Sequence, residues 1–269
     1  MLREARGEFV AVLNMDLVVD PGWLPPLVAF LRAHPEAGVV NPLILLADGS
    51  RINAAGQDVH VTGLGFNRGL GQPLDSQGTE PIAVSGIQGS AFVVRTADLR
   101  RLGGMDVLGF LYHEDVNLSW LYRMSGYTLH CVPKSRVRHD YFLSMYPEKF
   151  HLLERNRVAM LLTYPRTSSL VALSPLLILT ELLAWGYSLL RGRSFLAAKG
   201  RSYWWVWSHR AAIALRRDRA QSLRAAPDRL ILASLRWTYS WDQFLTLGRE
   251  RGRSARQPAG GLQTTAGPT

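Results

Sequence analysis

The sequence predicts an α/β fold in which a mixed sheet with flanking helices is followed by a helical C-terminal region. Through residues 1–165, short apolar runs bounded by glycine and proline alternate with stretches of helical length. From residue 166 onward the composition shifts to arginine and tryptophan among apolar stretches, a pattern typical of helices. With 269 residues, 47% of them hydrophobic, the chain is long enough to bury a substantial core.

The expected elements begin close to the N-terminus. Phe9–Leu13 is a continuous apolar run and indicates a buried strand of a parallel or mixed sheet. A helix is expected at about Leu24–Ala33, where His34 and Pro35 end it. Residues 38–46 indicate the next strand. Residues 50–80 are rich in glycine and polar residues, and we expect them to form a long surface loop.

The remaining elements of the predicted α/β part alternate in type. They are strand, bend and strand at 82–94, a helix at 96–102, a helix at 114–125, a strand with its extension at 127–139, and a helix at 147–164. This order predicts three regions: an α/β domain at 1–165, a helical region at 166–251 and a disordered tail at 252–269, which is rich in glycine, proline, threonine and glutamine.

All of the net positive charge lies in the last part of the chain. Residues 1–190 hold 16 Lys and Arg against 17 Asp and Glu, whereas residues 191–269 hold 15 against 4. A basic, tryptophan-rich region joined to an electroneutral domain indicates contact with an anionic surface, either a membrane or a nucleic acid. We expect no nucleic-acid partner, because no recognised nucleic-acid module is present and the arginines follow apolar stretches.

Residues 169–190 are about long enough to cross a bilayer, at roughly 20 residues per span. Pro175 and Glu181 lie near the middle of this segment and disfavour a simple span, so an interfacial or re-entrant hairpin is expected. The tryptophans at 204–207, with Trp237 and Trp241, suit helices that lie in a headgroup layer. The alternative is an ordinary helical subdomain packed on the core.

Two observations bear on the compartment. The single cysteine, Cys131, excludes a disulfide framework and most metal clusters, fits a reducing compartment, and is expected to be a buried structural thiol. Residues 1–8 lack the apolar core of a secretory signal. The expected location is the cytoplasmic face of the cell membrane, with peripheral or monotopic attachment.

Polar side chains that suit catalysis occur at three places. Glu114 and Asp115 are adjacent at a helix start, where one acidic residue would suffice to complement the helix dipole. Asp16 and His139 each follow a predicted strand, and strand ends in α/β sheets open onto a crevice. One carboxylate and one imidazole could hold a hard divalent ion together with waters and phosphate oxygens, which leaves Glu114 or Asp115 as a base. Taken singly, each pattern also fits a solvated helix start, a turn residue or a core histidine.

The order of these motifs resembles the family 2 glycosyltransferases, inverting enzymes with the GT-A fold. The matching segments are residues 12–16 with 21–24, similar to the DXD-type segment; residues 86–95, 102–106 and 110–120, similar to the acceptor-side and ED block; and residues 137–139 and 154–157, similar to the later His and RN elements. The resemblance covers about residues 5–165, and it is specific because four motifs occur in one order.

This resemblance implies transfer of a hexosyl or deoxyhexosyl group from a nucleotide-sugar donor to a cell-envelope glycan or lipid-linked acceptor. Asp115 would remove the proton from the acceptor hydroxyl as that oxygen attacks the anomeric carbon, giving inversion. Glu114 would orient the acceptor or support the base, and the two roles could be exchanged.

The resemblance also implies a divalent metal, Mg²⁺ or Mn²⁺, which neutralises the departing diphosphate. Asp16 and His139 would hold it, and Asn14 stands where a stricter motif has its first Asp. Arg155 and Arg157 would add phosphate contacts, or would belong to a solvated helix face.

In one respect the sequence departs from the family pattern. Family members begin with a βαβ half that builds most of the nucleotide pocket, so a partial GT-A, Rossmann-like fold is expected here. The chain could start inside a longer protein, take this half from a partner chain, or be a decayed copy. The first is favoured, because a buried strand without its neighbour exposes an edge. The alternative function is a non-catalytic, membrane-bound scaffold or one subunit of a split enzyme.

Overall fold

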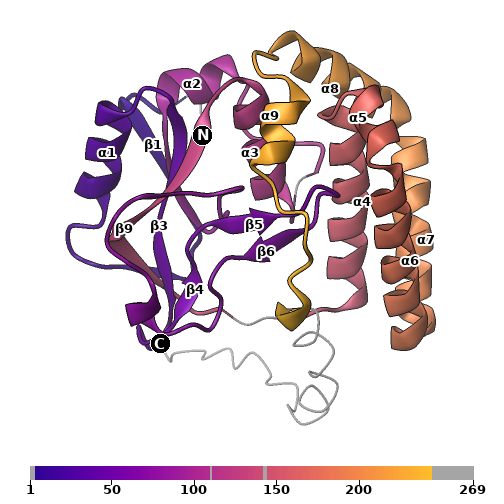
Figure 1. Ribbon diagram of the computed structural model, residues 1–269, viewed down its shortest axis with the longest axis horizontal. Coiled ribbons are helices and arrows are strands. Elements are labelled where there is room, and N and C mark those ends of the chain that lie inside the picture. The colour runs from indigo at the N-terminus through magenta and orange to yellow at the C-terminus, as the bar shows by residue number, and fades with distance from the viewer. Residues whose placement is uncertain (1–3, 110, 142–143, 244–269) are drawn as a thin grey trace, which may run out of the picture.

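The computed structural model describes residues 4–109, 111–141 and 144–243. In this part of the chain, a seven-stranded mixed sheet lies beside a layer of long helices (Figure 1). The strands are β1 Phe9–Leu13, β2 Leu17–Val19, β3 Ala37–Leu46, β4 Ile52–Ala54, β5 Gln57–Val59, β6 Gly65–Asn67, β7 Ile82–Ala83, β8 Ala91–Arg95 and β9 Thr128–His139. The α-helices are α1 Leu24–Ala33, α2 Thr96–Arg101, α3 Glu114–Met124, α4 Pro147–Thr163, α5 Thr167–Ala172, α6 Ser174–Arg191, α7 Arg193–Ser208, α8 Arg210–Ser222 and α9 Asp228–Ala233, and Leu74–Ser76 form a 3₁₀ turn.

The sheet is built around β3, which the apolar run from residue 38 predicts. Its order is β1-β8-β3-β9-β2, with β4 added to β3 and β7 added to β9. Strand β3 runs parallel to β9 and antiparallel to β8, so the predicted mixed α/β sheet is confirmed. Cys131, on β9, is buried as expected, and burial raises the pKa of its thiol to about 12.

The first strand differs from its prediction. Strand β1 pairs with β8 at the end of the sheet order rather than lying in its interior, and Leu13 is 40% exposed. An apolar run predicts a strand well, but it does not say how many neighbours the strand has. The expectation of a fully buried β1 was therefore wrong for the described residues.

The segment 50–80 is also more ordered and more buried than predicted. It contains β4 and the two-stranded sheet of β5 and β6, and most residues between 52 and 63 are buried. Its glycines make tight turns rather than a surface loop: Gly63 has φ +85°, and an added Cβ would lie 2.5 Å from Met160 Cε on α4.

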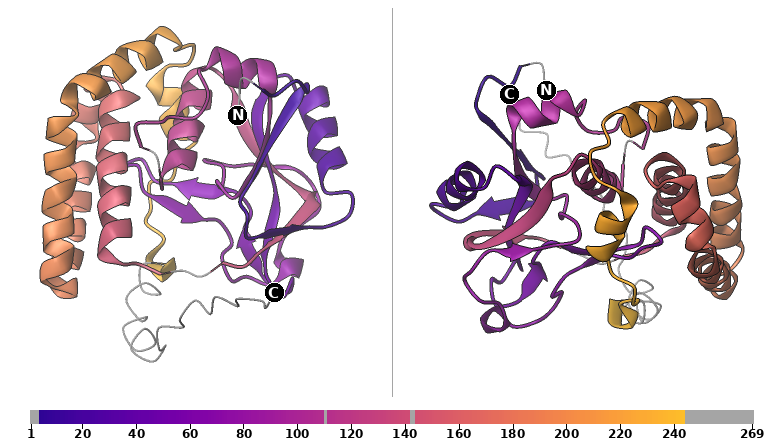
Figure 2. Two further views of the ribbon diagram at one scale, coloured as in Figure 1. Left: turned by 180° about the vertical axis from the view of Figure 1, so that it is seen from behind. Right: turned by 45° about the horizontal axis from the view of Figure 1, so that its top comes forward.

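The C-terminal helices pack against α4 and against one another. Helices α6 and α7 lie side by side on the outer face of α4, and α8 crosses one end of this layer (Figures 1 and 2). Residues 169–190 form the end of α5 and most of α6, so the predicted hairpin within this segment is wrong. Among the described residues, none of the helices combines the length and apolar character that a membrane span needs.

After α9 the chain returns to the sheet side. The Arg236 amide donates to the Val59 carbonyl at 2.8 Å, and the Tyr239 ring stacks on His60 at 4.2 Å between centroids. The predicted boundary at 165/166 falls between α4 and α5, while the predicted tail at 252–269 lies outside the described residues.

Candidate active site

The loop that leads into α3 has a strained backbone. Tyr112 and His113 have φ values of 63° and 68°, in the left-handed region that residues other than glycine rarely adopt. Such strain persists only where surrounding contacts fix it, and it is concentrated at functional sites. Two consecutive residues in this conformation directly precede the carboxylate pair and set the direction in which helix α3 begins.

Side chains from α3 and α4 hold this loop. The Asn117 amide donates to the His113 carbonyl at 2.8 Å, and the Asn156 amide donates to the Tyr112 carbonyl at 2.7 Å. Asn156 also donates to the carbonyls of Leu111 and Gly109 at 2.9 and 3.1 Å. Residue type drew attention to the arginines on either side of Asn156 and not to this residue, which received no predicted role. The resemblance to the RN element was the only signal in the sequence that pointed to it.

His113 is a neutral hydrogen-bond donor. Its Nε2 lies 2.7 Å from the Gly63 carbonyl, which can only accept, so Nε2 carries the proton. Burial lowers the pKa of His113 to about 4, and the positive charge of Arg157 acts in the same direction. The ring therefore fixes the loop by one directed hydrogen bond at neutral pH.

Asp115 is partly buried and well supplied with donors. Its Oδ2 accepts from Gln57 Nε2 at 2.7 Å and from the Gly89 amide at 3.2 Å, and its Oδ1 accepts from the Val116 amide at 2.7 Å. Burial raises the pKa of Asp115, and these three hydrogen bonds oppose that rise because they favour the carboxylate.

Glu114 has the contrasting environment. Its Oε2 is buried and, within the described residues, has no hydrogen-bond partner. Burial and the neighbouring charge of Asp115 raise the pKa of Glu114 to about 7. In a coupled pair the proton stays on the carboxyl group with fewer donors, so the pair holds a protonated Glu114 beside an ionised Asp115.

The predicted metal residues Asp16 and His139 also meet. Asp16 Oδ2 lies 3.3 Å from His139 Nε2, because β2 pairs with the end of β9 and brings Leu17 opposite His139. His139 Nδ1 lies 3.0 Å from Asn53 Oδ1 and donates to it, so Nε2 is the ring nitrogen that faces the carboxylate. An imidazole nitrogen and a carboxylate oxygen this close together could bind one divalent cation, and the buried Asn53 fixes the ring as a hydrogen-bond partner of a ligating histidine does in metal sites.

Asn14 is placed by its backbone, since its amide donates to the Ser90 carbonyl at 2.8 Å. The residue before Ser90 is Gly89, whose amide donates to Asp115, so one segment contacts both the backbone of Asn14 and the Asp115 carboxylate. No group of three or more His, Cys, Asp and Glu side chains suited to a metal occurs in the described part of the chain. A metal held by Asp16 and His139 would therefore take its other ligands from the donor phosphates and water.

The two arginines that were predicted to bind phosphate, Arg155 and Arg157, differ in their surroundings. Arg155 donates to the Gly109 carbonyl at 3.1 Å and lies over the Trp205 ring at 4.6 Å. Arg157 is 1% exposed and is ion-paired with Glu154 and Glu181. Neither the predicted phosphate contact nor the alternative of a solvated helix face fits Arg157, because its guanidinium is enclosed by carboxylates.

The first part of the chain is similar in sequence to known glycosyltransferases. Residues 1–78 match the family model described as Glycosyl transferase family 2. The N-acetylglucosaminyl-diphospho-decaprenol L-rhamnosyltransferase of two Mycobacterium tuberculosis strains is 31% identical over 143 residues, which are 49% of this chain and 47% of that protein. The chain thus spans about half the length of the curated relatives it matches.

Two solved structures are similar at lower levels. The crystal structure of GalNAc-T7 with UDP, GalNAc and Mn²⁺ has a TM-score of 0.47 and 22% identity, covering 60% of this chain and 32% of that chain. The mannosyltransferase PcManGT from Pyrobaculum calidifontis, in complex with GDP-Man and Mn²⁺, has a TM-score of 0.37 and 16% identity, covering 93% of this chain and 65% of that chain.

Proposed function

Because this chain is related to the family 2 glycosyltransferases, we propose that it transfers a glycosyl group from a nucleotide-sugar donor to a lipid-linked glycan acceptor. The observation that carries the proposal is the carboxylate pair at the start of α3, in which Asp115 has three hydrogen-bond donors and Glu114 Oε2 has none among the described residues. The name of the relatives favours a deoxyhexose as the sugar and a diphosphate-linked polyprenol glycan as the acceptor.

Asp115 acts as the general base of this reaction. The second lone pair of its Oδ1 is available to accept the proton of the acceptor hydroxyl, and that oxygen attacks the anomeric carbon opposite the leaving diphosphate. One displacement of this kind inverts the configuration. Glu114, whose raised pKa of about 7 leaves a large fraction of its carboxyl groups protonated at neutral pH, donates a hydrogen bond to the acceptor in that form and then adds no second negative charge beside the base.

Asp16 and His139 would hold a divalent metal, Mg²⁺ or Mn²⁺. When bound, this ion supplies the positive charge that stabilises the departing diphosphate. Asn53 supports the arrangement by fixing the His139 ring, and the segment at Gly89 and Ser90 contacts both Asp115 and the backbone of Asn14, two residues before Asp16.

We place the reaction at the cytoplasmic face of the membrane, where a polyprenol-linked acceptor is held. Exposed apolar side chains support this location. Ile178, Leu182, Trp185 and Leu189 share one face of α6 at helical spacing and are at least 40% exposed. On α7, Trp204 and Trp207 are 66% and 56% exposed. Peripheral attachment by these helices suits a basic, tryptophan-rich region.

Asp115→Asn is the test of the catalytic assignment. Release of nucleoside diphosphate is measured with purified protein, a panel of nucleotide hexoses and deoxyhexoses, and a diphosphate-linked polyprenol N-acetylglucosamine acceptor, with Mn²⁺ and with a chelator. We expect the variant to lose roughly 10²–10⁴-fold in kcat, because the amide cannot accept the proton. Its circular dichroism should match that of the wild type.

The alternative scaffold function gives a different result. A non-catalytic remnant would release no diphosphate with any donor in the panel, and it would show no Mn²⁺-dependent donor binding by calorimetry. Transfer that Asp115→Asn leaves unchanged would remove Asp115 from the mechanism.

A further inference from the structure

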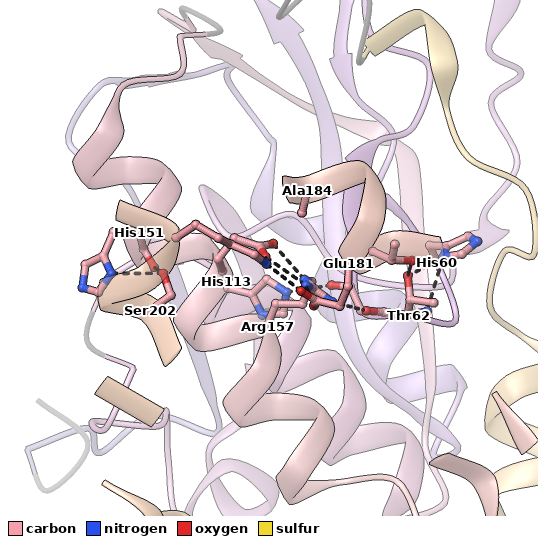
Figure 3. Close-up of polar contacts among 12 residues, drawn as sticks. His60, Thr62, His113, His151, Arg157, Glu181, Ala184 and Ser202 are labelled. Carbon is pink, nitrogen blue, oxygen red and sulfur yellow. Dashed lines mark hydrogen bonds and ion pairs between the residues drawn. The ribbon is translucent and has the colours of Figure 1, made fainter. Parts of the chain in front are cut away.

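Four charged side chains meet where α4, α6 and α7 pack together: the buried Glu154, Arg157 and Lys199, and the partly buried Glu181. Arg157 Nε lies 2.9 Å from Glu154 Oε1, and its Nη2 lies 2.5 Å from Glu181 Oε1. Lys199 Nζ lies 2.8 Å from Glu181 Oε2 and also contacts Glu154. Arg157 is 1% exposed and Lys199 is 0% exposed. Figure 3 shows Arg157 and Glu181 facing each other within this cluster.

The cluster is balanced, with two cations and two anions. Taking four charges out of water is costly, and apolar residues of similar size would hold three helices together as well or better. Stability alone therefore does not account for it. A buried ion-pair cluster does fix geometry, because each of its members has only one arrangement that satisfies its partners.

One contact of Arg157 points out of the cluster. Its Nη1 donates to the Thr62 carbonyl at 3.3 Å, at the turn between β5 and β6. The Thr62 hydroxyl also receives a hydrogen bond from Thr180 on α6, at 3.0 Å. The next residue, Gly63, packs directly on α4, since a Cβ there would lie 3.2 Å from Arg157 Cγ. Arg157 of α4 and Thr180 of α6 thus hold this turn from two helices.

The same turn holds the loop of the candidate active site. The Gly63 carbonyl accepts the hydrogen bond from His113 Nε2 at 2.7 Å, and His113 is the strained residue directly before Glu114. A continuous set of contacts therefore leads from Glu181 and Lys199, through Arg157 and the 62–63 turn, to His113 and the first residues of α3. Figure 3 shows Glu181, Arg157, Thr62 and His113 of this set.

We propose that Arg157 is a positioning residue for the carboxylates Glu114 and Asp115, which it holds in place through the 62–63 turn and His113, and that helices α6 and α7 serve the reaction by fixing Arg157. The proposal rests on the proposed function for its kinetic consequence. Its structural part, the control of His113 by Arg157, is independent of that function.

Two double variants with the same change in charge test this proposal. Arg157→Met with Glu154→Gln leaves the Glu181–Lys199 pair and removes the contact with Thr62. Lys199→Met with Glu154→Gln leaves the Glu181–Arg157 pair and keeps that contact. Each double variant loses one cation and one anion from the same cluster. Any effect that comes only from reduced folding stability should therefore appear in both variants. Arg157→Lys is a third variant. It keeps the positive charge but replaces the three nitrogens of the planar guanidinium group with a single ammonium nitrogen.

Two measurements are made on each full-length variant. The first is kcat and KM for the donor and the acceptor, below the unfolding temperature of each protein. The second is the NMR titration of the His113 ring, whose signals are assigned with a His113→Gln protein. Besides the burial that lowers its pKa, His113 faces the charges of Arg157, Glu154 and Arg216.

We expect kcat to fall about 10- to 100-fold in the Arg157→Met double variant and in Arg157→Lys, with KM little changed. A small displacement of the carboxylates is enough to slow the chemical step without weakening substrate binding. The Lys199→Met double variant should stay within about threefold of the wild type. The pKa of His113 should rise in the Arg157→Met double variant, where the positive charge is removed, and also in Arg157→Lys, where the charge stays but the contact is lost and water enters the loop.

Equal losses of kcat in the two double variants, with an unmoved His113 titration, would overturn the proposal and leave the cluster a structural role. A wild-type value of kcat in folded Arg157→Lys would overturn it as well. If no protein shows transfer, the proposed function fails, and the His113 titration still decides whether Arg157 positions the loop.

Discussion

At the residue scale, two ionisable groups before and at the start of α3 have pKa values shifted by burial. The neutral His113 donates to Gly63, and the protonated Glu114 stands beside Asp115. The two shifts act on folding stability in opposite ways. A histidine with a depressed pKa of about 4 gives stability that is lost as pH falls, whereas a carboxyl group with a raised pKa gives stability that is lost as pH rises.

Glu114→Gln isolates the second shift. The pKa of Glu114 rises from its ordinary 4.5 to about 7, so the native state binds the extra proton between these values and loses relative stability as pH rises through 7. The glutamine cannot ionise. We expect the Tm of the variant to exceed that of the wild type by roughly a few degrees at pH 8 and to match it near pH 5.

Differential scanning calorimetry across this pH range measures the effect. Glu36→Gln is a matched control, because that carboxylate is exposed and its pKa is lowered rather than raised. A Tm difference between Glu114→Gln and wild type that does not change with pH would show that Glu114 titrates normally and that the pair is not coupled.

Some of the candidate site residues could be predicted from the sequence, and others could not. Glu114, Asp115, Asp16 and His139 were chosen from residue type and order, and the structure brings Asp16 to His139 and places the other two together at a helix start. Arg157 was assigned wrongly, because its partner Glu181 lies 24 residues away on another helix. Local pattern contains no information about such a pairing, and Glu181 itself was interpreted only as unfavourable in a membrane.

At the element scale, helical and strand periodicity predicted most elements but not their neighbours. The helix after Pro147 and the strand before His139 match α4 and β9 closely. Strand β1 was expected to be buried and has one paired neighbour in the described sheet. Pairing is set by tertiary contacts, which an apolar run of five residues does not encode.

Helices α6 and α7 carry the exposed apolar face that we assign to the membrane. Trp185 on α6 stacks on Tyr203 of α7 at 6.1 Å, and Trp204 lies 5.1 Å from Trp207, so the aromatic side chains of the two helices are neighbours. Arg210 lies over Trp207 at 4.7 Å and adds a positive charge beside them. Apolar rings flanked by arginine suit a surface of anionic lipid.

Trp204→Ser combined with Trp207→Ser should weaken sedimentation with phosphatidylglycerol vesicles about tenfold or more, because two exposed aromatic side chains no longer enter the headgroup layer. The Tm should change little, since both rings are more than half exposed. Met15→Ser is the control, because Met15 is fully exposed next to β1, away from α6 and α7. Equal vesicle binding by the wild type, the double tryptophan variant and Met15→Ser would contradict the assignment of the exposed face of α6 and α7 to the membrane.

At the scale of the whole molecule, the sheet and the C-terminal helices share one hydrophobic core. The main cluster of buried residues joins Val39 of β3 and Trp120 of α3 to Leu173, Ala220 and Ile231 of the helical region. The sequence predicted a division after residue 165 because composition changes there. Composition describes the surface that each part offers to solvent, and it does not show whether two parts share a core.

A shared core and the buried ion pairs predict that both parts unfold together. Lys199→Met leaves Glu154 and Glu181 with one cation, Arg157, and an unbalanced buried charge costs about 3–5 kcal/mol. In urea, far-UV circular dichroism reports all of the helices. The ¹⁹F NMR signal of Trp120 in 5-fluorotryptophan-labelled protein reports the core beside the sheet, because it is resolved from the signals of the other seven tryptophans; Trp120 is 1% exposed. We expect the two signals of the variant to coincide, at a lower midpoint than in the wild type, because residues of the helical region complete the core that covers α3. A first transition seen by circular dichroism alone, with Trp120 still native, would mean that the helices form a separate unit and that the contacts from Lys199 to His113 do not bind the two parts into one.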